Sequence, residues 1–273
     1  MKNLLRRSVT GILFVILVFG TLFAGSIAFL VFYLALLILS LLEFYKHKER
    51  SGFRVQKYTA IFSSILLFVF LFGYASGILG LRWLSILLLI PPVMMIRQLY
   101  RNDERDFDSL AVTFYGLIYI ALPLSLLNLI VFHSGTGQGQ YDPSLLAGIF
   151  ILIMLNDTAA FLIGVRFGRN RLFERISPKK TWEGTICGGI VALAAAFFMS
   201  GLFQVLDRIE WLVVALIVAV FGIYGDLVES LFKRRLGIKD SGQLLPGHGG
   251  ILDRLDAWLL VIPVVWVYTN FIF

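Results

Sequence analysis

Long apolar segments alternate with short polar segments along the whole chain. Most of the apolar segments are close to the ~20 residues that a helix needs to cross the hydrocarbon core of a bilayer. The first of them, residues 9–42, is too long for one helix, and Gly20, Thr21, Gly25 and Ser26 interrupt its middle, so we divide it into a hairpin of two helices. The remaining predicted helices are Tyr58–Tyr74, Ile78–Ile96, Leu110–Phe132, Ser144–Val165, Thr185–Leu206, Trp211–Leu231 and Ala257–Phe271.

This pattern predicts an all-α, polytopic integral membrane protein with about nine transmembrane helices. The composition agrees, because 59% of the 273 residues are hydrophobic and only 15% are charged. A net charge of +7 would suggest nucleic-acid binding in a soluble protein. Here the basic residues are confined to short segments between apolar ones, so we expect no nucleic-acid partner and a single membrane domain over residues 1–273.

The lysines and arginines also predict the orientation. If the N-terminus is cytoplasmic, all of the 24 basic residues except Arg82 and Arg208 fall on the cytoplasmic side, where such residues are enriched. Removing or adding one helix would destroy this alternation. We therefore expect an outward C-terminus, insertion in the cell (inner) membrane, and polar chemistry that faces the cytoplasm.

Acidic residues divide the chain functionally. The first part of the chain holds only Glu43 as an acid near a predicted helix, which suggests that residues 1–97 are scaffold helices and residues 98–143 a middle helix with its connections. Residues 144–273 are then the catalytic helices, because they contain the other acids within or beside apolar segments: Asp157, Asp226, Glu229, Asp253 and Asp256.

Two pairs of carboxylates repeat one spacing. Asp226 and Glu229 lie three residues apart, as do Asp253 and Asp256, so each pair shares a face of a helix. An ionised carboxylate at the centre of a membrane helix costs about 2.5–3.5 kcal/mol, so such groups usually face water, a partner charge or an ion. The four oxygen ligands predict a Mg²⁺ site. Structural ion pairs are the alternative.

Basic residues and one histidine lie between these pairs. Lys233, Arg234 and Lys239 suit phosphate groups, although a basic cluster after an apolar helix is also a common cytoplasmic anchor. His248 stands among glycines that allow a ligand to approach the backbone. It is a candidate proton carrier or hydrogen-bond donor to a phosphate, and an ordinary loop histidine is the alternative.

Two further groups precede this stretch. Lys179 and Lys180 come just before a helix that we expect to start near Thr181, which places ammonium groups and free backbone N–H groups together, as phosphate binding requires. A capping turn at the lipid headgroups is the alternative. Asn156 and Asp157 lie within a predicted membrane helix, where they form either an interhelical hydrogen bond or part of the same polar site.

The C-terminal motifs resemble those of a known family, the phosphatidate cytidylyltransferases, also called CDP-diacylglycerol synthases. The resemblance covers about 27 residues without a gap and extends to two earlier motifs, whereas the N-terminal helices carry no matching motif. The matching residues are Asn156-Asp157, Ser177-Pro178-Lys179-Lys180-Thr181-Trp182-Glu183-Gly184, Ser230-Leu231-Phe232-Lys233-Arg234, Lys239-Asp240, Leu245-Pro246, His248-Gly249-Gly250 and Asp253-Arg254-Leu255-Asp256.

The resemblance implies Mg²⁺-dependent transfer of a cytidylyl group from CTP to phosphatidic acid, which gives CDP-diacylglycerol and pyrophosphate for phospholipid biosynthesis. It also implies a homodimer and allows a second, monovalent cation such as K⁺. We assign the residues to three roles. The catalytic group is Asp226, Asp253, Asp256, Lys233 and His248; the substrate-binding group is Lys179, Lys180, Arg234, Lys239, Asp157 and Arg254; the metal ligands are Asp226, Asp253, Asp256 and Glu229.

Two other functions remain open from the residues alone. A CDP-alcohol phosphotransferase also uses clustered aspartates with Mg²⁺, but its glycine- and alanine-rich aspartate motif is not apparent here. A transporter also carries acids within its membrane helices, but the usual repeated pair of broken helices is not apparent either.

Overall fold

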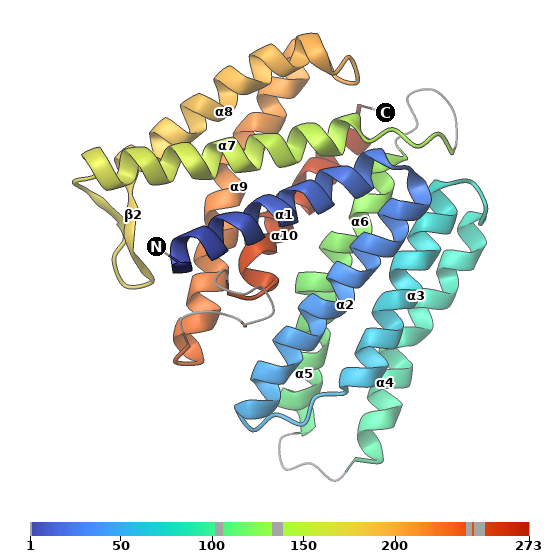
Figure 1. The fold of residues 1–273 in the computed structure, drawn as a ribbon. Coiled ribbons are helices and arrows are strands. Elements are labelled where there is room, and N and C mark those ends of the chain that lie inside the picture. Colours follow the sequence, from blue (N-terminus) through green and yellow to red (C-terminus); the bar gives the residue numbers. More distant parts are fainter. Residues whose placement is uncertain (1, 102–105, 133–138, 239–241, 243–248, 273) are drawn as a thin grey trace. The chain divides into compact units, whose positions relative to one another are not determined.

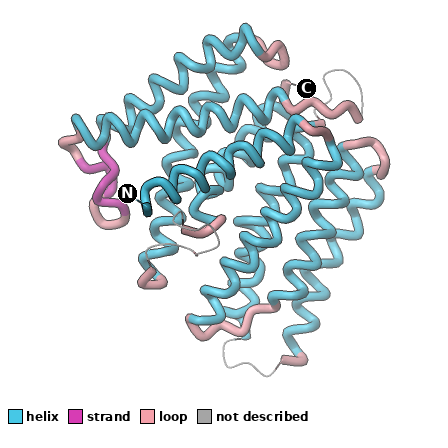
Figure 2. The backbone as a smooth tube through the Cα atoms, in the orientation of Figure 1, coloured by secondary structure: helices cyan, strands magenta, loops and turns pink. Residues whose placement is uncertain are grey.

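The computed structural model describes residues 2–101, 106–132, 139–238, 242 and 249–272, with the side chains of all these except residues 2–8 and 106 (Figures 1 and 2). The contacts within the chain divide it into two compact units, and the single membrane domain expected over residues 1–273 stays a prediction. The first unit comprises Met1–Tyr141 with Asp240–Arg254, and the second comprises Asp142–Lys239 with Leu255–Ile272. The proposed division into scaffold and catalytic helices stays a prediction.

The first unit begins with the predicted helical hairpin. Helix α1 (Lys2–Phe23) and helix α2 (Ser26–Arg50) are joined by a short turn (Figure 1). Gly25 at this turn has a φ of 114°, a conformation that residues with a Cβ rarely adopt. The division of the first apolar segment into two helices is therefore confirmed. Helix α3 (Lys57–Ala75) follows.

Prolines shape the next two helical segments. The 3₁₀ helix η1 (Leu81–Leu89) continues directly into α4 (Ile90–Leu99), and α5 (Asp106–Gly116) continues through the π-helical turn η2 (Leu117–Ala121) into α6 (Leu122–Val131). Both α4 and α6 have proline in their first turn. Proline lacks an N–H and clashes with the carbonyl four residues earlier, which accounts for the non-α turns just before these helices.

Aromatic residues near the end of α2 hold this helix against α5 within the first unit. The buried Tyr45 hydroxyl donates a hydrogen bond to the carbonyl of Thr113 at 2.8 Å. Gly116 leaves space for this ring, because a Cβ there would lie 2.7 Å from the Tyr45 Cζ atom. Phe44 stacks on Tyr115 with ring centroids 5.8 Å apart. The end of α2 is thus fixed by packing and by a buried hydrogen bond.

The second unit contains α7 (Ser144–Phe167), strands β1 (Arg171–Phe173) and β2 (Ser177–Thr181), α8 (Trp182–Leu202), α9 (Arg208–Arg235) and most of α10 (Leu252–Asn270). The two strands pair antiparallel in a small hairpin between α7 and α8 (Figure 2). The all-α prediction missed this hairpin because a strand pair of this length has no long alternating pattern.

The start of α8 is as expected. Thr181 caps the helix, and its hydroxyl accepts a hydrogen bond from the N–H of Gly184 at 3.3 Å. Helix α9 begins with a full capping box, in which Asp207 and Glu210 each accept the other's backbone N–H at 2.7 Å.

Small residues allow the helices of the second unit to approach closely. A Cβ on Gly184 of α8 would lie 2.5 Å from the carbonyl oxygen of Ala160 on α7, and one on Gly188 would lie 2.8 Å from that of Asn156. On α9, a Cβ on Gly225 would collide with the carbonyl oxygen of Asp256 on α10. Figure 1 shows α7 and α8 running side by side. Such contacts are typical of helix packing in membranes.

Seven helices in the described part of the chain are long and apolar enough to cross a membrane. They agree with seven of the predicted segments, and α1 and α10 coincide with the other two. Helix α10 is less apolar because Asp253, Arg254 and Asp256 lie in its first turns. The protein is thus a polytopic membrane protein, while the count of nine transmembrane helices and the positions of the termini stay predictions.

We predict that Gly184→Ala destabilises the protein by about 1–3 kcal/mol, because the new methyl group must displace backbone atoms of α7. Gly201→Ala, on the same helix, is the matched control, since a Cβ there meets nothing within 4 Å. Thermal unfolding of both variants in detergent micelles measures the difference. Equal unfolding temperatures for the two variants would contradict the close packing of α7 on α8.

Candidate active site

Three carboxylates gather where α9 becomes polar. Asp226 and Glu229 lie in the last turns of α9, and Asp256 lies in α10. One carboxylate oxygen from each of the three lies within 4.8 Å of the other two. The side chain of Glu229 is only 1% exposed, whereas that of Asp226 is 40% exposed. The group therefore has a buried side and an accessible side.

Two lysines lie against these acids. Lys180, at the end of β2, places its Nζ 2.7 Å from Asp226 Oδ2 and donates to the carbonyl oxygen of Ile223 at 3.4 Å. Lys233 places its Nζ 2.6 Å from Glu229 Oε2, one helical turn away on α9. In the part of the chain that the structure describes, the three carboxylates thus lie with at least two ammonium groups.

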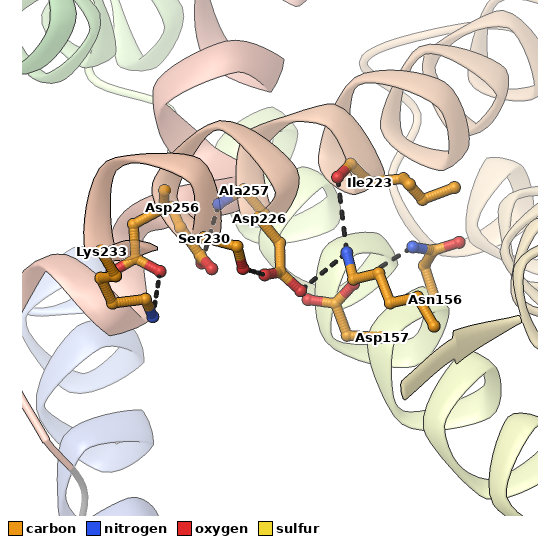
Figure 3. Close-up of polar contacts among 10 residues, drawn as sticks. Asn156, Asp157, Ile223, Asp226, Ser230, Lys233, Asp256 and Ala257 are labelled. Atoms are coloured by element: carbon orange, nitrogen blue, oxygen red, sulfur yellow. Dashed lines mark hydrogen bonds and ion pairs between the residues drawn. The ribbon is translucent and has the colours of Figure 1, made fainter. Parts of the chain in front are cut away.

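Neighbouring groups orient the remaining oxygens. The Ser230 hydroxyl donates to Asp226 Oδ1 at 3.1 Å, and the backbone N–H of Ala257 donates to Asp256 Oδ1 at 2.9 Å (Figure 3). The close approach of α9 and α10 at Gly225 brings the Asp256 backbone against α9. These contacts hold both aspartates in place, and both oxygens of Asp226 have a partner, Ser230 on Oδ1 and Lys180 on Oδ2.

The donor atoms fit a hard divalent cation. All three ligands are carboxylate oxygens, the type that Mg²⁺ prefers, and Mg²⁺ usually keeps several waters beside one or two protein carboxylates. Asp226, Glu229 and Asp256, all predicted as metal ligands from the sequence, are thus the residues that could hold it.

Asp157 lies close to this group. It is on α7, accepts a hydrogen bond from Asn156 Nδ2 at 3.2 Å, and interacts electrostatically with Lys180 and Asp226. Figure 3 shows its carboxylate beside that of Asp226. This hydrogen bond joins two consecutive residues of α7, so it is not the interhelical hydrogen bond that was one of the two expectations. The structure instead favours membership of the polar site.

The other predicted basic residues differ in their surroundings. Lys179 is exposed on β2, next to Lys180. The Nε of Arg234 donates to the carbonyl of Ile176 at 3.4 Å, which connects the end of α9 to the β-hairpin. Arg254 is exposed in the first turn of α10. Their roles in substrate binding stay predictions.

Asp253 is not part of the group of three carboxylates. It belongs to the first unit, where its Oδ2 accepts the backbone N–H of Gly250 at 2.8 Å at the start of α10. Its assignment as a metal ligand stays a prediction. Lys239 and His248, assigned to substrate binding and catalysis, lie outside the described residues, as does Asp240.

Glu183 is a candidate residue that the sequence reasoning did not assign. Its carboxylate accepts hydrogen bonds from Asn170 Nδ2 at 2.8 Å, from the Asn170 N–H at 3.1 Å and from the Arg169 N–H at 3.2 Å. These bonds tie the residues after α7 to the first turn of α8, at the base of the hairpin that carries Lys180. An acid in the first turn of a helix was the available signal, although such acids usually only stabilise the helix dipole.

Comparisons with known proteins cover nearly the whole chain. Residues 5–272 match the cytidylyltransferase family. A protein of Bacillus subtilis (strain 168) named phosphatidate cytidylyltransferase is 30% identical over 275 residues, which cover 97% of each chain. One of Staphylococcus aureus (strain COL) with the same name is 30% identical over 95% of this chain and 96% of its own. A third protein with this name, from Staphylococcus saprophyticus, is 44% identical over 118 residues, which cover 42% of this chain and 45% of its own.

We predict that Asp256→Asn weakens divalent cation binding by at least about tenfold, or about 1.4 kcal/mol, because it removes one of three charged ligands. Mn²⁺ titration followed by electron paramagnetic resonance measures this without any substrate. Glu174→Gln is the control, since Glu174 is exposed on the β-hairpin of the same unit. An unchanged Mn²⁺ affinity of the Asp256→Asn protein would reject the metal site.

Proposed function

The chain belongs to the cytidylyltransferase family, and from this premise we propose that it transfers a cytidylyl group from CTP to phosphatidic acid. Family membership makes the protein an enzyme that transfers a nucleotidyl group. The products are CDP-diacylglycerol, a precursor for phospholipids, and pyrophosphate. The observation that carries the proposal is the group of Asp226, Glu229 and Asp256 with Lys180 and Lys233 beside it, since a cation and two ammonium groups together suit polyphosphate.

A membrane enzyme is the physical requirement of such a reaction. One substrate is a lipid with an anionic headgroup, and the other is a water-soluble triphosphate. The polar group of residues lies where the apolar helix α9 ends in Lys233, Arg234 and Arg235, which is where headgroups and solutes meet. Cytoplasmic orientation in the inner membrane, and assembly as a homodimer, are parts of the proposal.

Asp226, Glu229 and Asp256 would hold Mg²⁺, with Asp253 as a further predicted ligand. When bound, the cation neutralises the triphosphate and stabilises the charge that develops on the α-phosphate. Two of these carboxylates differ in exposure and in the lysine that each one binds. Glu229 is buried and holds Lys233, while Asp226 is partly exposed and holds Lys180, so each acid also keeps a lysine ready at the site. A second, monovalent cation such as K⁺ would add to the same charge balance.

Lys180 and Lys233 would bind the phosphates of the two substrates. Both ammonium groups end long flexible side chains, so each can move from its carboxylate to a phosphate oxygen with little backbone movement. The hydrogen bond from Lys180 to the Ile223 carbonyl keeps it near α9 in either state. Lys179, Arg234, Arg254, Lys239, Asp157 and His248 complete the proposed substrate and catalytic groups.

The chemical step is an in-line displacement. An oxygen of the lipid phosphate attacks the α-phosphorus of CTP and forms the new P–O bond, while the bond from that phosphorus to the β-phosphate oxygen breaks and pyrophosphate leaves. A phosphate monoester has a second pKa near 6, so it is largely dianionic at neutral pH and needs no strong base. Catalysis therefore depends on positioning and on charge stabilisation.

The decisive experiment incubates purified protein with radiolabelled CTP, Mg²⁺ and phosphatidic acid in micelles. We expect label in the lipid phase and release of pyrophosphate that depends on the lipid, and both should stop when a chelator removes Mg²⁺. In a parallel incubation without CTP, transfer of the phosphoalcohol group from a labelled CDP-alcohol to a second alcohol, with release of CMP, would instead indicate a phosphotransferase. Solute uptake by proteoliposomes without nucleotide would indicate a transporter.

We predict that Asp256→Asn and Asp253→Asn each abolish measurable turnover, a loss of about 10²–10³-fold, because removal of one electrostatic contact to a transition state costs that much and each of these aspartates is expected to act through the metal. Both variants should insert in membranes and elute as the wild-type protein does. Glu174→Gln again serves as the control. Wild-type rates from the Asp256→Asn protein would exclude its role in the reaction.

A further inference from the structure

Glu43 is a buried carboxylate on α2, one of the N-terminal helices, in which the sequence shows no motif of the proposed reaction. It is only 4% exposed. A buried carboxylate costs several kcal/mol unless charged or hydrogen-bonding partners compensate it. Its burial near the end of an apolar helix therefore indicates a specific task.

The contacts of Glu43 are with the segment that leads into α10. Its Oε2 accepts the backbone N–H of Ile251 at 2.9 Å, in a buried hydrogen bond. Gly242 also lies against it, because a Cβ at that position would be 2.7 Å from the Glu43 Cδ and Oε2 atoms. One side chain of α2 thus contacts two positions of the C-terminal part of the chain, all within the first unit.

Hydrogen bonds of backbone groups at residues 250, 251 and 254 hold the start of α10. Gly250 donates its N–H to Asp253 Oδ2 at 2.8 Å, the next residue, Ile251, donates to Glu43, and the carbonyl of Ile251 accepts the N–H of Arg254 at 2.9 Å. Two consecutive N–H groups at the start of the helix are therefore satisfied by two carboxylates. Asp253 is local, whereas Glu43 comes from a distant helix.

The part of α2 that carries Glu43 is held by packing and by a buried hydrogen bond. The next two residues of α2 are Phe44, which stacks on Tyr115, and Tyr45, whose hydroxyl bonds to the Thr113 carbonyl on α5. All three side chains from Glu43 to Tyr45 are buried. A carboxylate mounted on such a fixed helix end can define where the bound amide lies.

We infer that Glu43 is a positioning residue for the reaction: it holds Ile251 and so fixes the first turn of α10, the helix that carries Asp253 and Asp256. The N-terminal helices then act on the catalytic residues through this contact. This inference rests on the proposed function, since it assigns Asp256 to the metal.

The test compares Glu43→Leu with Glu43→Gln in the full-length protein. Leucine fills similar space but accepts no hydrogen bond, whereas the glutamine amide oxygen can still accept the Ile251 N–H. Glu49→Gln is the matched control on the same helix, because Glu49 is exposed and pairs only loosely with Lys57, at 3.5 Å. Gly242→Ala tests the same contact without changing Glu43, because the new Cβ would lie 2.7 Å from the Glu43 carboxylate. Gly80→Ala is its control, since a Cβ on Gly80 meets nothing within 4 Å.

We expect Glu43→Leu to lower Mn²⁺ affinity and to raise the Mg²⁺ concentration for half-maximal activity by roughly 10- to 100-fold, as loss of a residue that orients metal ligands commonly does. Amide hydrogen exchange should be faster in peptides that cover residues 249–252. Glu43→Gln should keep most of the wild-type behaviour, and Gly242→Ala should shift all three measurements in the direction of Glu43→Leu.

A purely structural role predicts a different result. Glu43→Leu would then lower the unfolding temperature, while the folded protein kept wild-type Mn²⁺ affinity, Mg²⁺ dependence and exchange at residues 249–252, and the inference would be wrong. Equal losses in Glu43→Gln and Glu43→Leu would also refute it, because the accepted hydrogen bond would then be irrelevant. Failure of the proposed function is separate, since it would appear as an inactive wild-type protein.

Discussion

Compensation of buried negative charge is the constraint on which the site depends. Three carboxylates lie within 4.8 Å of one another at the end of an apolar helix, where isolated ionised acids are costly. Lys180 and Lys233 cancel part of this charge. In the proposed function, a divalent cation binds this group and polyphosphate binds through it. The interactions that make the acids tolerable would then be the same ones that suit them to nucleotidyl transfer.

Packing of small residues brings these charges together. Gly225 lets the backbone of Asp256 contact α9, and Gly184 and Gly188 let α8 lie directly on α7. The β-hairpin between α7 and α8 carries Lys180 to Asp226, and Glu183 holds the base of that hairpin through Asn170 and Arg169. Backbone contacts of this kind leave little freedom, so the fold itself holds these carboxylate and ammonium groups close together.

The helices and much of the site could be predicted from the sequence alone. The helical segments follow from apolar length, and the turn at Gly25 follows from interruption of an apolar segment. Asp226 and Glu229 share a helix face, so their proximity follows from the helical period. The β-hairpin could not be predicted, because its pairing depends on the attachment of its ends to α7 and α8 rather than on an alternating pattern.

By itself, the sequence determined the fold class, the family, and the residue types of the site, because hydropathy and local spacing are properties of a chain read in order. Only the tertiary structure decided that Asp256 joins Asp226 and Glu229, that Lys180 pairs with Asp226, and that Glu43 bonds to Ile251. These contacts join residues far apart along the chain. Their partners are selected by close helix packing and by the cost of buried charge, which no local pattern records.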